Sequence, residues 1–369
     1  MLQPTVASRR CVVTAADETR GTPRCHPSRT RYTFDESAAP VIGGSTAPVA
    51  ALSGSDNNGG HAIPSATTAS FDEPELFAAS VTGFEARYLP ITRDRRFTRL
   101  ELPLESGRLV VVTRPPMLFE GAVVADHGVI TFQLDHKRTA RVNGSSVNAD
   151  TMARWKKGTE YRAYQQSRLT HCQLFLSDAV AARGWPEPEP GHHVLSIAPN
   201  SSAHLRSFVS DVAEVIQSDP ARIANPNVLK GMDRSIIGGV DDALSTFVLP
   251  SSSLATGRYL AICRRARDYL RESDFRIQSN VEVANACGVH VRTLHNAFIA
   301  VLGMSLRQYL LLHRLWLVRG ALLRAEAGDL VKSIALDHGF WHLGRFSRLY
   351  QSRFGEAPST TLARRGAIR

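Results

Sequence analysis

The sequence predicts a multidomain α+β protein, with an antiparallel β-barrel or sandwich and flanking helices in its N-terminal half and an all-α C-terminal domain. Three observations lead to this prediction. Short strand-like segments follow one another from residue 71 to 199, the hydrophobic pattern then becomes helical, and no proline occurs between Pro250 and Pro358. With 369 residues, 43% of them hydrophobic, the chain can form two or three domains with their own cores.

The first 70 residues are rich in Ser, Thr, Ala, Gly and Pro, as in the run from Gly43 to Gly60. A segment of this composition buries too little apolar surface to offset the conformational entropy lost on folding. We therefore expect residues 1–70 to form a disordered N-terminal tail.

Residues 71–199 are expected to form a β-rich domain. Asn143-Gly144 is a strong signal for a two-residue hairpin turn, because both residues tolerate positive φ. The expected strands are residues 98–105, 108–114, 129–135, 139–144, 161–166 and 170–176. Many short strands at this spacing favour a small antiparallel barrel or sandwich.

The histidines of this β-rich domain lack the spacing of a metal site. A metal-binding cupin needs an HxH pair, a Glu and a later His that converge on one ion, and no such set occurs. His192 and His193 are adjacent, so on a strand they would point to opposite faces. We expect His127, His136 and His171 to be hydrogen-bonded core or surface residues, and we predict no metal, no cofactor and no catalytic residues.

Residues 200–250 show helical periodicity in two apolar stripes. The first stripe contains Leu205, Phe208, Val212, Val215 and Ile216, and the second contains Val228, Met232, Ile236, Ile237, Val240, Ala243, Leu244 and Phe247. Pro250 and the serines at 251–253 mark the end of this segment.

Residues 255–369 are expected to form an all-α domain. Capping-box patterns begin at Ser279 and Ser305, and Asp329 is placed to cap a third helix. The expected helices cover residues 258–272, 280–287, 291–302, 305–325, 329–338 and 342–353, with a short helix from 359.

Two segments of this domain show the pattern of a helix-turn-helix. In the first, residues 281–303, the small residue Ala284 lets two helices approach and Gly288 can adopt the left-handed conformation at the turn. Leu294, Phe298 and Val301 recur at helical spacing and anchor the second helix, so its other face stays free. The second segment, residues 330–355, repeats the scheme with Ile334, Ala335, Gly339, Phe340, Phe346 and Tyr350.

These residues resemble the C-terminal domain of the AraC/XylS family of bacterial transcription regulators. The matching positions are Ala284, Gly288, Arg292, Leu294, Phe298, Gly303, Tyr309, Arg314, Leu315, Leu322, Ile334, Ala335, Gly339, Phe340, Phe346, Phe354, Gly355 and Pro358. The resemblance implies a double helix-turn-helix that binds DNA. Residues 71–199 resemble, more loosely, the cupin-like sensor domain of this family. The resemblance to the family also implies that the helices of residues 200–250 pair two copies of the chain. The alternative is that these helices pack on the β-rich domain.

In a helix-turn-helix the second helix enters the major groove, so the residues opposite its buried face are candidates for DNA contact. On the two reading helices these are Val291, Arg292, His295, Asn296, Ile299, His342, Gly344, Arg345, Ser347, Arg348 and Gln351. Arg292 suits guanine and Asn296 suits adenine. No residues are assigned to an effector site.

The long helix between the two motifs has about 20 residues and a length of about 30 Å, close to one turn of B-DNA. The two reading helices could therefore enter successive major-groove segments on one face of the duplex. Leu311, Leu312, Trp316 and Leu317 give this helix an additional apolar face. We expect this face to contact the sensor domain or a second copy of the chain; local repacking is the alternative.

Charge is distributed unevenly along the chain. Residues 258–369 contain 18 basic and eight acidic residues, whereas the rest contains 26 of each. Seventeen of the 18 are arginines, whose planar fork suits phosphates and guanine edges. An acidic polymer is thus the expected partner. The five cysteines form no CxxC pair, and no segment approaches the roughly 20 apolar residues of a membrane span.

Together with these observations, the resemblance to the AraC/XylS family implies a cytoplasmic, nucleoid-associated bacterial regulator that binds double-stranded promoter DNA sequence-specifically. It would act as an activator, contact RNA polymerase, respond to a small-molecule effector through its N-terminal domain, and form a homodimer. The alternative is a ligand-independent DNA-binding protein whose β-rich domain serves only for dimerisation or partner binding. An enzyme is not expected, because neither a metal set nor a nucleophile-base pattern occurs.

Overall fold

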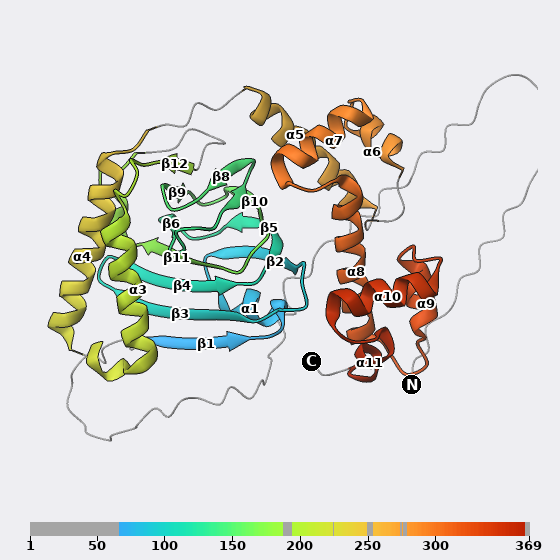
Figure 1. Cartoon of the computed structure of the whole chain (residues 1–369), viewed down its shortest axis with the longest axis horizontal. Coiled ribbons are helices and arrows are strands. Elements are labelled where there is room, and N and C mark those ends of the chain that lie inside the picture. Colours follow the sequence, from blue (N-terminus) through green and yellow to red (C-terminus); the bar gives the residue numbers. More distant parts are fainter. Residues whose placement is uncertain are drawn as a thin grey trace, which may run out of the picture. The chain divides into compact units, whose positions relative to one another are not determined.

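The computed structural model describes residues 66–186, 194–223, 225–248, 254–273, 275 and 279–365 (Figure 1). The predicted tail up to residue 65, the His192-His193 pair and the serines at 251–253 lie outside the described residues.

The β-rich domain contains twelve described strands in two sheets. The elements are β1 (Thr67–Phe71), α1 (Pro74–Ser80), β2 (Phe84–Pro90), β3 (Phe97–Leu104), β4 (Gly107–Arg114), β5 (Met117–Val123), β6 (Val129–Gln133), β7 (Ala140–Val142), β8 (Ser145–Val147), β9 (Thr151–Trp155), β10 (Glu160–Gln165), β11 (Leu169–Leu176), α2 (Asp178–Ala181) and β12 (Val194–Ser196). The larger sheet has the order β1-β3-β4-β11-β6-β9-β12, the smaller β2-β5-β10-β7-β8, and neighbouring strands are antiparallel. The predicted α+β class is confirmed, and these strands form two open sheets.

Strand β4 shows how the larger sheet is buried on both faces. Val110 and Val112 belong to the core between the two sheets, whereas Leu109 and Val111 belong to a second core on the outer face. Successive side chains of a strand point to opposite faces, so a strand covered on both sides is apolar at every position. This explains the uninterrupted run Leu109–Val112.

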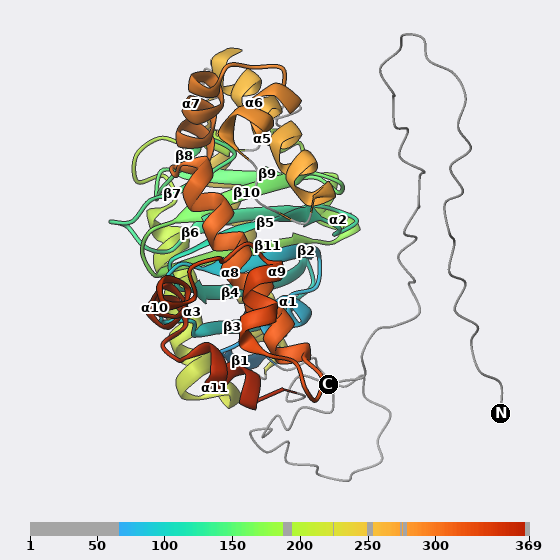
Figure 2. The same ribbon diagram turned by 90° about the vertical axis from the view of Figure 1, so that its right-hand side faces the viewer.

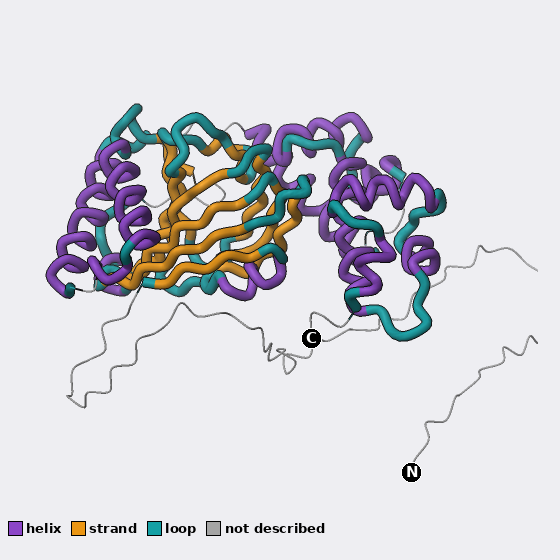
Figure 3. The backbone as a smooth tube through the Cα atoms, turned by 60° about the horizontal axis from the view of Figure 1, so that its bottom comes forward, coloured by secondary structure: helices purple, strands orange, loops and turns teal. Residues whose placement is uncertain are grey.

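Two helices cover the outer face of the larger sheet: α3 (Ala203–Ser218) and α4 (Pro226–Ser245), joined by the 3-10 turn η1 (Pro220–Ile223) (Figure 3). Leu205 and Ile236 pack in one core with sheet residues such as Leu109. The buried Asp233 of α4 accepts hydrogen bonds from the backbone N–H and the hydroxyl of Ser106. The two predicted helical stripes thus pack on the β-rich domain, which was the alternative to pairing two copies of the chain.

The all-α domain contains seven described helices, as expected. They are α5 (Leu254–Glu272), α6 (Asn280–Ala286), α7 (Val291–Leu302), α8 (Leu306–Arg324), α9 (Val331–Asp337), α10 (Leu343–Phe354) and α11 (Pro358–Ala363). The helices α6 and α7 lie at one end of α8, and α9, α10 and α11 lie around its other end (Figures 1 and 2). No helix in the described part of the chain is long and apolar enough to span a membrane.

Local signals in the sequence account for most helix boundaries. Ser279 and Ser305 form complete capping boxes with Glu282 and Gln308, which confirms both predictions. The prediction for Asp329 is wrong: its carboxylate accepts a hydrogen bond from the Glu326 N–H, and α9 begins without a side-chain cap. The hairpin prediction is confirmed, since Asn143 and Gly144 have φ of 49° and 82° between β7 and β8.

Candidate nucleic-acid interface

The first helix-turn-helix consists of α6, a tight turn and α7. Gly288 has φ of 64° in the turn, and the Val289 N–H donates to the Ala284 carbonyl over 3.0 Å. Leu294 and Phe298 of α7 are buried in the core of the all-α domain. The turn and this apolar row fix the rotation of α7 about its axis, so one face of the helix remains exposed.

The second helix-turn-helix consists of α9, a turn and α10, and it repeats the geometry of the first. Gly339 has φ of 81°, and the Phe340 N–H donates to the Ala335 carbonyl over 2.9 Å. Phe346 and Tyr350 of α10 are buried where Leu294 and Phe298 are buried in the first unit. The two units thus share the conformation and the hydrogen bond of the turn.

All eleven residues predicted to contact DNA are exposed. They are Val291, Arg292, His295, Asn296 and Ile299 on α7, and His342, Gly344, Arg345, Ser347, Arg348 and Gln351 on α10 or directly before it. None of the described ion pairs involves Arg292, Arg345 or Arg348, so their guanidinium groups are available for phosphates or bases. Helix α8, with 19 residues, separates the two units along an axis of about 28 Å.

Several arginines of this domain stabilise the fold and are unavailable to DNA. Arg319 of α8 is only 1% exposed and donates to both Glu73 (2.9 Å) and Glu356 (2.6 Å). Arg267 pairs with Glu160, and Arg353 donates to the Ile91 carbonyl. Fewer of the arginines in this domain are therefore available to bind DNA than the number in the sequence suggests.

The additional apolar face of α8 packs against the β-rich domain. Leu312 and Trp316 lie in the same core as Leu89 of β2 and Leu118 of β5, and the Trp316 indole N–H donates to the Pro90 carbonyl over 3.3 Å. For these two side chains, the expected contact between this face and the N-terminal β-rich domain is confirmed.

A polar cluster is buried beside this apolar contact. Glu120 of β5 accepts a hydrogen bond from the Tyr309 hydroxyl over 2.9 Å and lies 3.7 Å from Nε2 of His313 and 3.8 Å from Nε of Arg162. His313 is stacked on Phe275 with ring centroids 4.3 Å apart. Burial lowers the pKa of His313 to about 4, although Glu120 opposes the shift, so the imidazole is neutral at pH 7.

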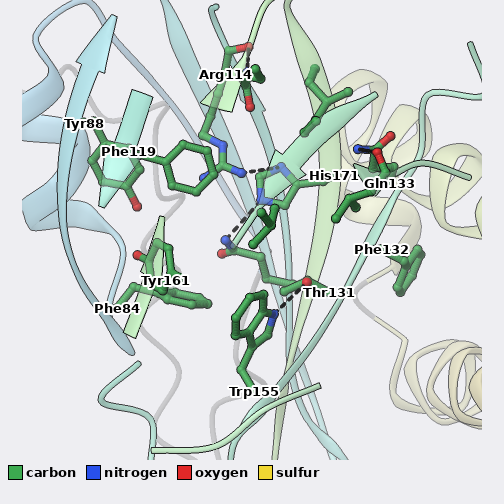
Figure 4. A pocket seen from close by; sticks show the side chains of 16 residues that line it. Phe84, Tyr88, Arg114, Phe119, Thr131, Phe132, Gln133, Trp155, Tyr161 and His171 are labelled. Carbon is green, nitrogen blue, oxygen red and sulfur yellow. Dashed lines mark hydrogen bonds between the residues drawn. The ribbon is translucent and has the colours of Figure 1, made fainter. Parts of the chain in front are cut away.

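A pocket lies between the two sheets of the β-rich domain (Figure 4). Its cavity measures about 60 Å³. It is lined by Phe84, Tyr88, Arg114, Phe119, Thr131, Phe132, Gln133, Ala140, Val142, Val147, Trp155, Tyr161, Gln165, Leu169, His171 and Gln173.

Arg114 and His171 are the basic side chains of this pocket. A guanidinium nitrogen of Arg114 lies 3.4 Å from Nδ1 of His171, and Nε2 of His171 lies 3.2 Å from the Gln173 amide nitrogen (Figure 4). The guanidinium also lies over the ring of Phe119, 4.0 Å from its centroid. Burial, and secondarily Arg114, lowers the pKa of His171 well below its usual value, so this histidine is neutral too.

None of the residues of this pocket is predicted from the sequence as a binding residue, although one signal is present. In the predicted strand 108–114, Arg114 has the same parity as Val110 and Val112, so it faces the interior of the sandwich. His171 is a hydrogen-bonded core residue, as expected. The described residues contain no group of three or more His, Cys, Asp or Glu side chains that could hold a metal ion.

Comparisons with known proteins place the two helix-turn-helix units in a family. The family model described as a helix-turn-helix domain matches residues 283–364. This region is an AraC/XylS-type DNA-binding domain. The chain is 31% identical over 162 residues to the probable thc operon regulatory protein of Rhodococcus erythropolis, covering 42% of this chain and 47% of that protein. It is 35% identical over 99 residues to the XylDLEGF operon transcriptional activator of Pseudomonas putida, covering 27% and 31%.

Solved structures of the same type are also similar. A probable AraC family transcriptional regulator from Rhodopseudomonas palustris CGA009 is 29% identical, with a TM-score of 0.27, over 28% of this chain and 97% of that one. The AraC-like transcriptional activator CuxR is 13% identical, with a TM-score of 0.37, over 68% and 94%. The chain spans less than half the length of the two curated relatives named above.

Proposed function

We propose that this protein is a sequence-specific DNA-binding transcription regulator that reads two adjacent major-groove segments with α7 and α10. The observation that carries the proposal is the repeated unit: two helix-turn-helices with the same turn conformation each leave one helix face exposed, and the 19-residue α8 separates them. Arg292 and Asn296 would read bases in one segment, and Arg345 and Arg348 would contact bases or phosphates in the next.

Activation of transcription is the proposed outcome of binding, because the Pseudomonas putida relative that is 35% identical over 99 residues is named a transcriptional activator. An activator at a promoter would contact RNA polymerase in the cytoplasm. Homodimerisation is a separate proposal, for which the exposed faces of α3 and α4 are available; light scattering of the purified chain would test it.

The β-rich domain is proposed to receive a small-molecule signal through the pocket between its sheets. The smaller sheet connects this pocket to α8. Phe119 and Tyr161 line the pocket, whereas the next residues in each strand, Glu120 and Arg162, face the opposite side and lie in the polar cluster with Tyr309. A ligand that shifts β5 or β10 would therefore shift the residues that hold α8.

DNA binding is tested by fluorescence anisotropy with a duplex selected from a random pool, measured against random-sequence competitor. Arg292→Ala and Arg348→Ala should each weaken specific binding by roughly 10-fold, and affinity should fall steeply with salt. Arg265→Ala is the matched control, because Arg265 is an exposed arginine on α5 outside both reading faces. Selected-duplex affinities that are identical in wild type and both reading-helix variants would overturn the proposed orientation.

A further inference from the structure

The pocket between the sheets contains a buried cation without an anion. The described part of the chain has six buried arginines, and five of them contact carboxylate or carbonyl oxygens. Arg319 pairs with two carboxylates, Arg267 and Arg162 with Glu160, while Arg154 and Arg206 donate to backbone carbonyls over 2.6 Å. Arg114 is 6% exposed, yet neither a carboxylate nor a carbonyl oxygen among the described residues contacts its guanidinium.

Arg114 has donors to spare. Its Nε has no hydrogen-bond partner, and the guanidinium contacts three neutral groups: the His171 ring through a long hydrogen bond, the Tyr88 hydroxyl and the face of Phe119. These groups offer two neutral acceptor atoms and a weakly accepting ring face to five N–H donors, and none of them carries a negative charge. Buried donors are normally paired, and an unpaired charged group is costly. A group absent from the chain itself would satisfy them.

The rest of the lining indicates the shape of that group. Tyr88 and Tyr161 lie near Arg114, and burial raises the pKa of both phenols, so both stay neutral; the Tyr88 oxygen accepts hydrogen bonds from Tyr161 and Arg114, which leaves its own proton to donate. Aromatic rings of Phe84, Phe119 and Trp155 form the surrounding wall (Figure 4). Such a site offers a guanidinium fork and a hydroxyl donor to one end of a ligand and flat apolar surfaces to the other.

We propose that this pocket binds a small organic carboxylate, whose carboxylate group pairs with Arg114 while its carbon skeleton lies between the aromatic rings. The inference rests on the sensor role proposed above and specifies the chemical class of the signal. A cavity of about 60 Å³ accommodates the carboxylate end. A longer acid needs more space than this, and the half-buried Val142 and Val147 of the β7–β8 hairpin border the pocket where it could widen.

The test uses pairs of probes that match in size and shape but differ in charge, in order of increasing size: acetate and acetamide, crotonate and crotonamide, benzoate and benzamide. Thermal unfolding of the full chain is recorded at increasing concentrations of each probe, up to about 100 times the Kd for a probe that saturates. A ligand that binds the folded state raises Tm by mass action. At least one carboxylate should raise Tm with a saturable concentration dependence, and its amide should not. Equal effects of every acid and its amide would overturn the proposal.

Variants separate recognition from stability. Arg114→Met should abolish the carboxylate-dependent shift, and Arg114→Lys, which keeps the charge without the fork, should reduce it. Arg108→Met is the control: Arg108 lies on the same strand, with its guanidinium 4.1 Å from the Phe175 ring, but it pairs with Glu101 and does not line the pocket. It should retain the shift. A shift that persists in Arg114→Met would contradict the proposal.

Failure of this inference is distinguishable from failure of the proposed function. Binding of wild-type protein to its selected duplex is measured in the absence of any probe, and its loss would remove the regulator proposal. A wild-type chain that binds DNA but shows no difference between acids and amides would instead remove only the carboxylate site.

Discussion

The polar groups buried against the two faces of the smaller sheet are partnered in opposite ways. On the face towards α8, Glu120 has Tyr309, His313 and Arg162 around it, and on α8 itself Arg319 lies between two carboxylates. On the face towards the pocket, Arg114 from β4 of the larger sheet lies over Phe119 and has no anionic partner among the described residues. Buried charges that are paired within the chain hold the fold together. A buried charge without a partner does not stabilise the fold, but it can bind a ligand of opposite charge.

The largest expected loss of stability follows from replacing Arg319, the buried cation that is paired with two carboxylates. Arg319→Ala removes the cation between Glu73 and Glu356 and should lower the free energy of unfolding by about 4 kcal/mol, because two partly buried carboxylates lose their partner. Denaturant unfolding measures the change. Arg364→Ala is the control: Arg364 also contacts Glu356, but its side chain is 43% exposed, so the loss should be below about 1 kcal/mol. Equal losses in the two variants would show that burial of Arg319 is energetically unimportant.

The next effect is a pH dependence of stability that comes from His313, the neutral histidine beside Glu120. Its pKa is about 4 in the folded protein and near the ordinary 6.5 when unfolded, so the unfolded state binds the proton more readily. The free energy of unfolding should therefore fall as pH decreases from about 6.5 to 4, by about 3 kcal/mol from this group. His171, whose pKa is also lowered, acts in the same direction.

The variant His313→Gln isolates this contribution. Its stability should depend less on pH over the same window than that of wild type, whereas His295→Gln, at an exposed position on α7, should leave the pH dependence unchanged. Urea unfolding at several pH values provides the measurement. An unaltered slope in His313→Gln would mean that another group is responsible.

The smallest expected change in stability follows from replacing Arg114, the buried cation that has no anionic partner among the described residues. Arg114→Met replaces a buried cation that has no anionic partner by an apolar side chain of similar length, so without any ligand the free energy of unfolding should stay equal or rise by about 1 kcal/mol. Thermal unfolding without added acids shows the sign. A loss of several degrees in Tm would indicate that Arg114 is a structural residue, and the contrast between the two faces would disappear.

Local signals made the helix-turn-helix units predictable from sequence. Ala284, Gly288 and Leu294 act within one supersecondary unit, and the capping boxes at Ser279 and Ser305 span three residues each. Such interactions are determined by near neighbours in the chain, so a pattern of small, turn and apolar residues identifies the two units and their exposed faces.

The buried polar groups were not predictable in this way, because their partners are distant in sequence. Glu120 in the run MLFEGAV suggests an exposed position, but it is buried by Tyr309, 189 residues away, and β5 itself was not predicted. Arg319 has the appearance of a solvent-facing arginine on a helix, yet Glu73 pairs with it from 246 residues away. Strands β2 and β9 were also missed, since charged residues such as Arg87 and Arg154 interrupt their apolar pattern.

Selection of preferred sequences from a random duplex pool tests the central claim most directly, namely that α7 and α10 read two separate segments of one site. Wild type should select two conserved blocks about 10 base pairs apart. The double variant Arg292→Ala/Asn296→Ala should lose preference in one block, and Arg345→Ala/Arg348→Ala in the other. Loss of the same block in both variants, or no enriched sequence for wild type, would contradict the account.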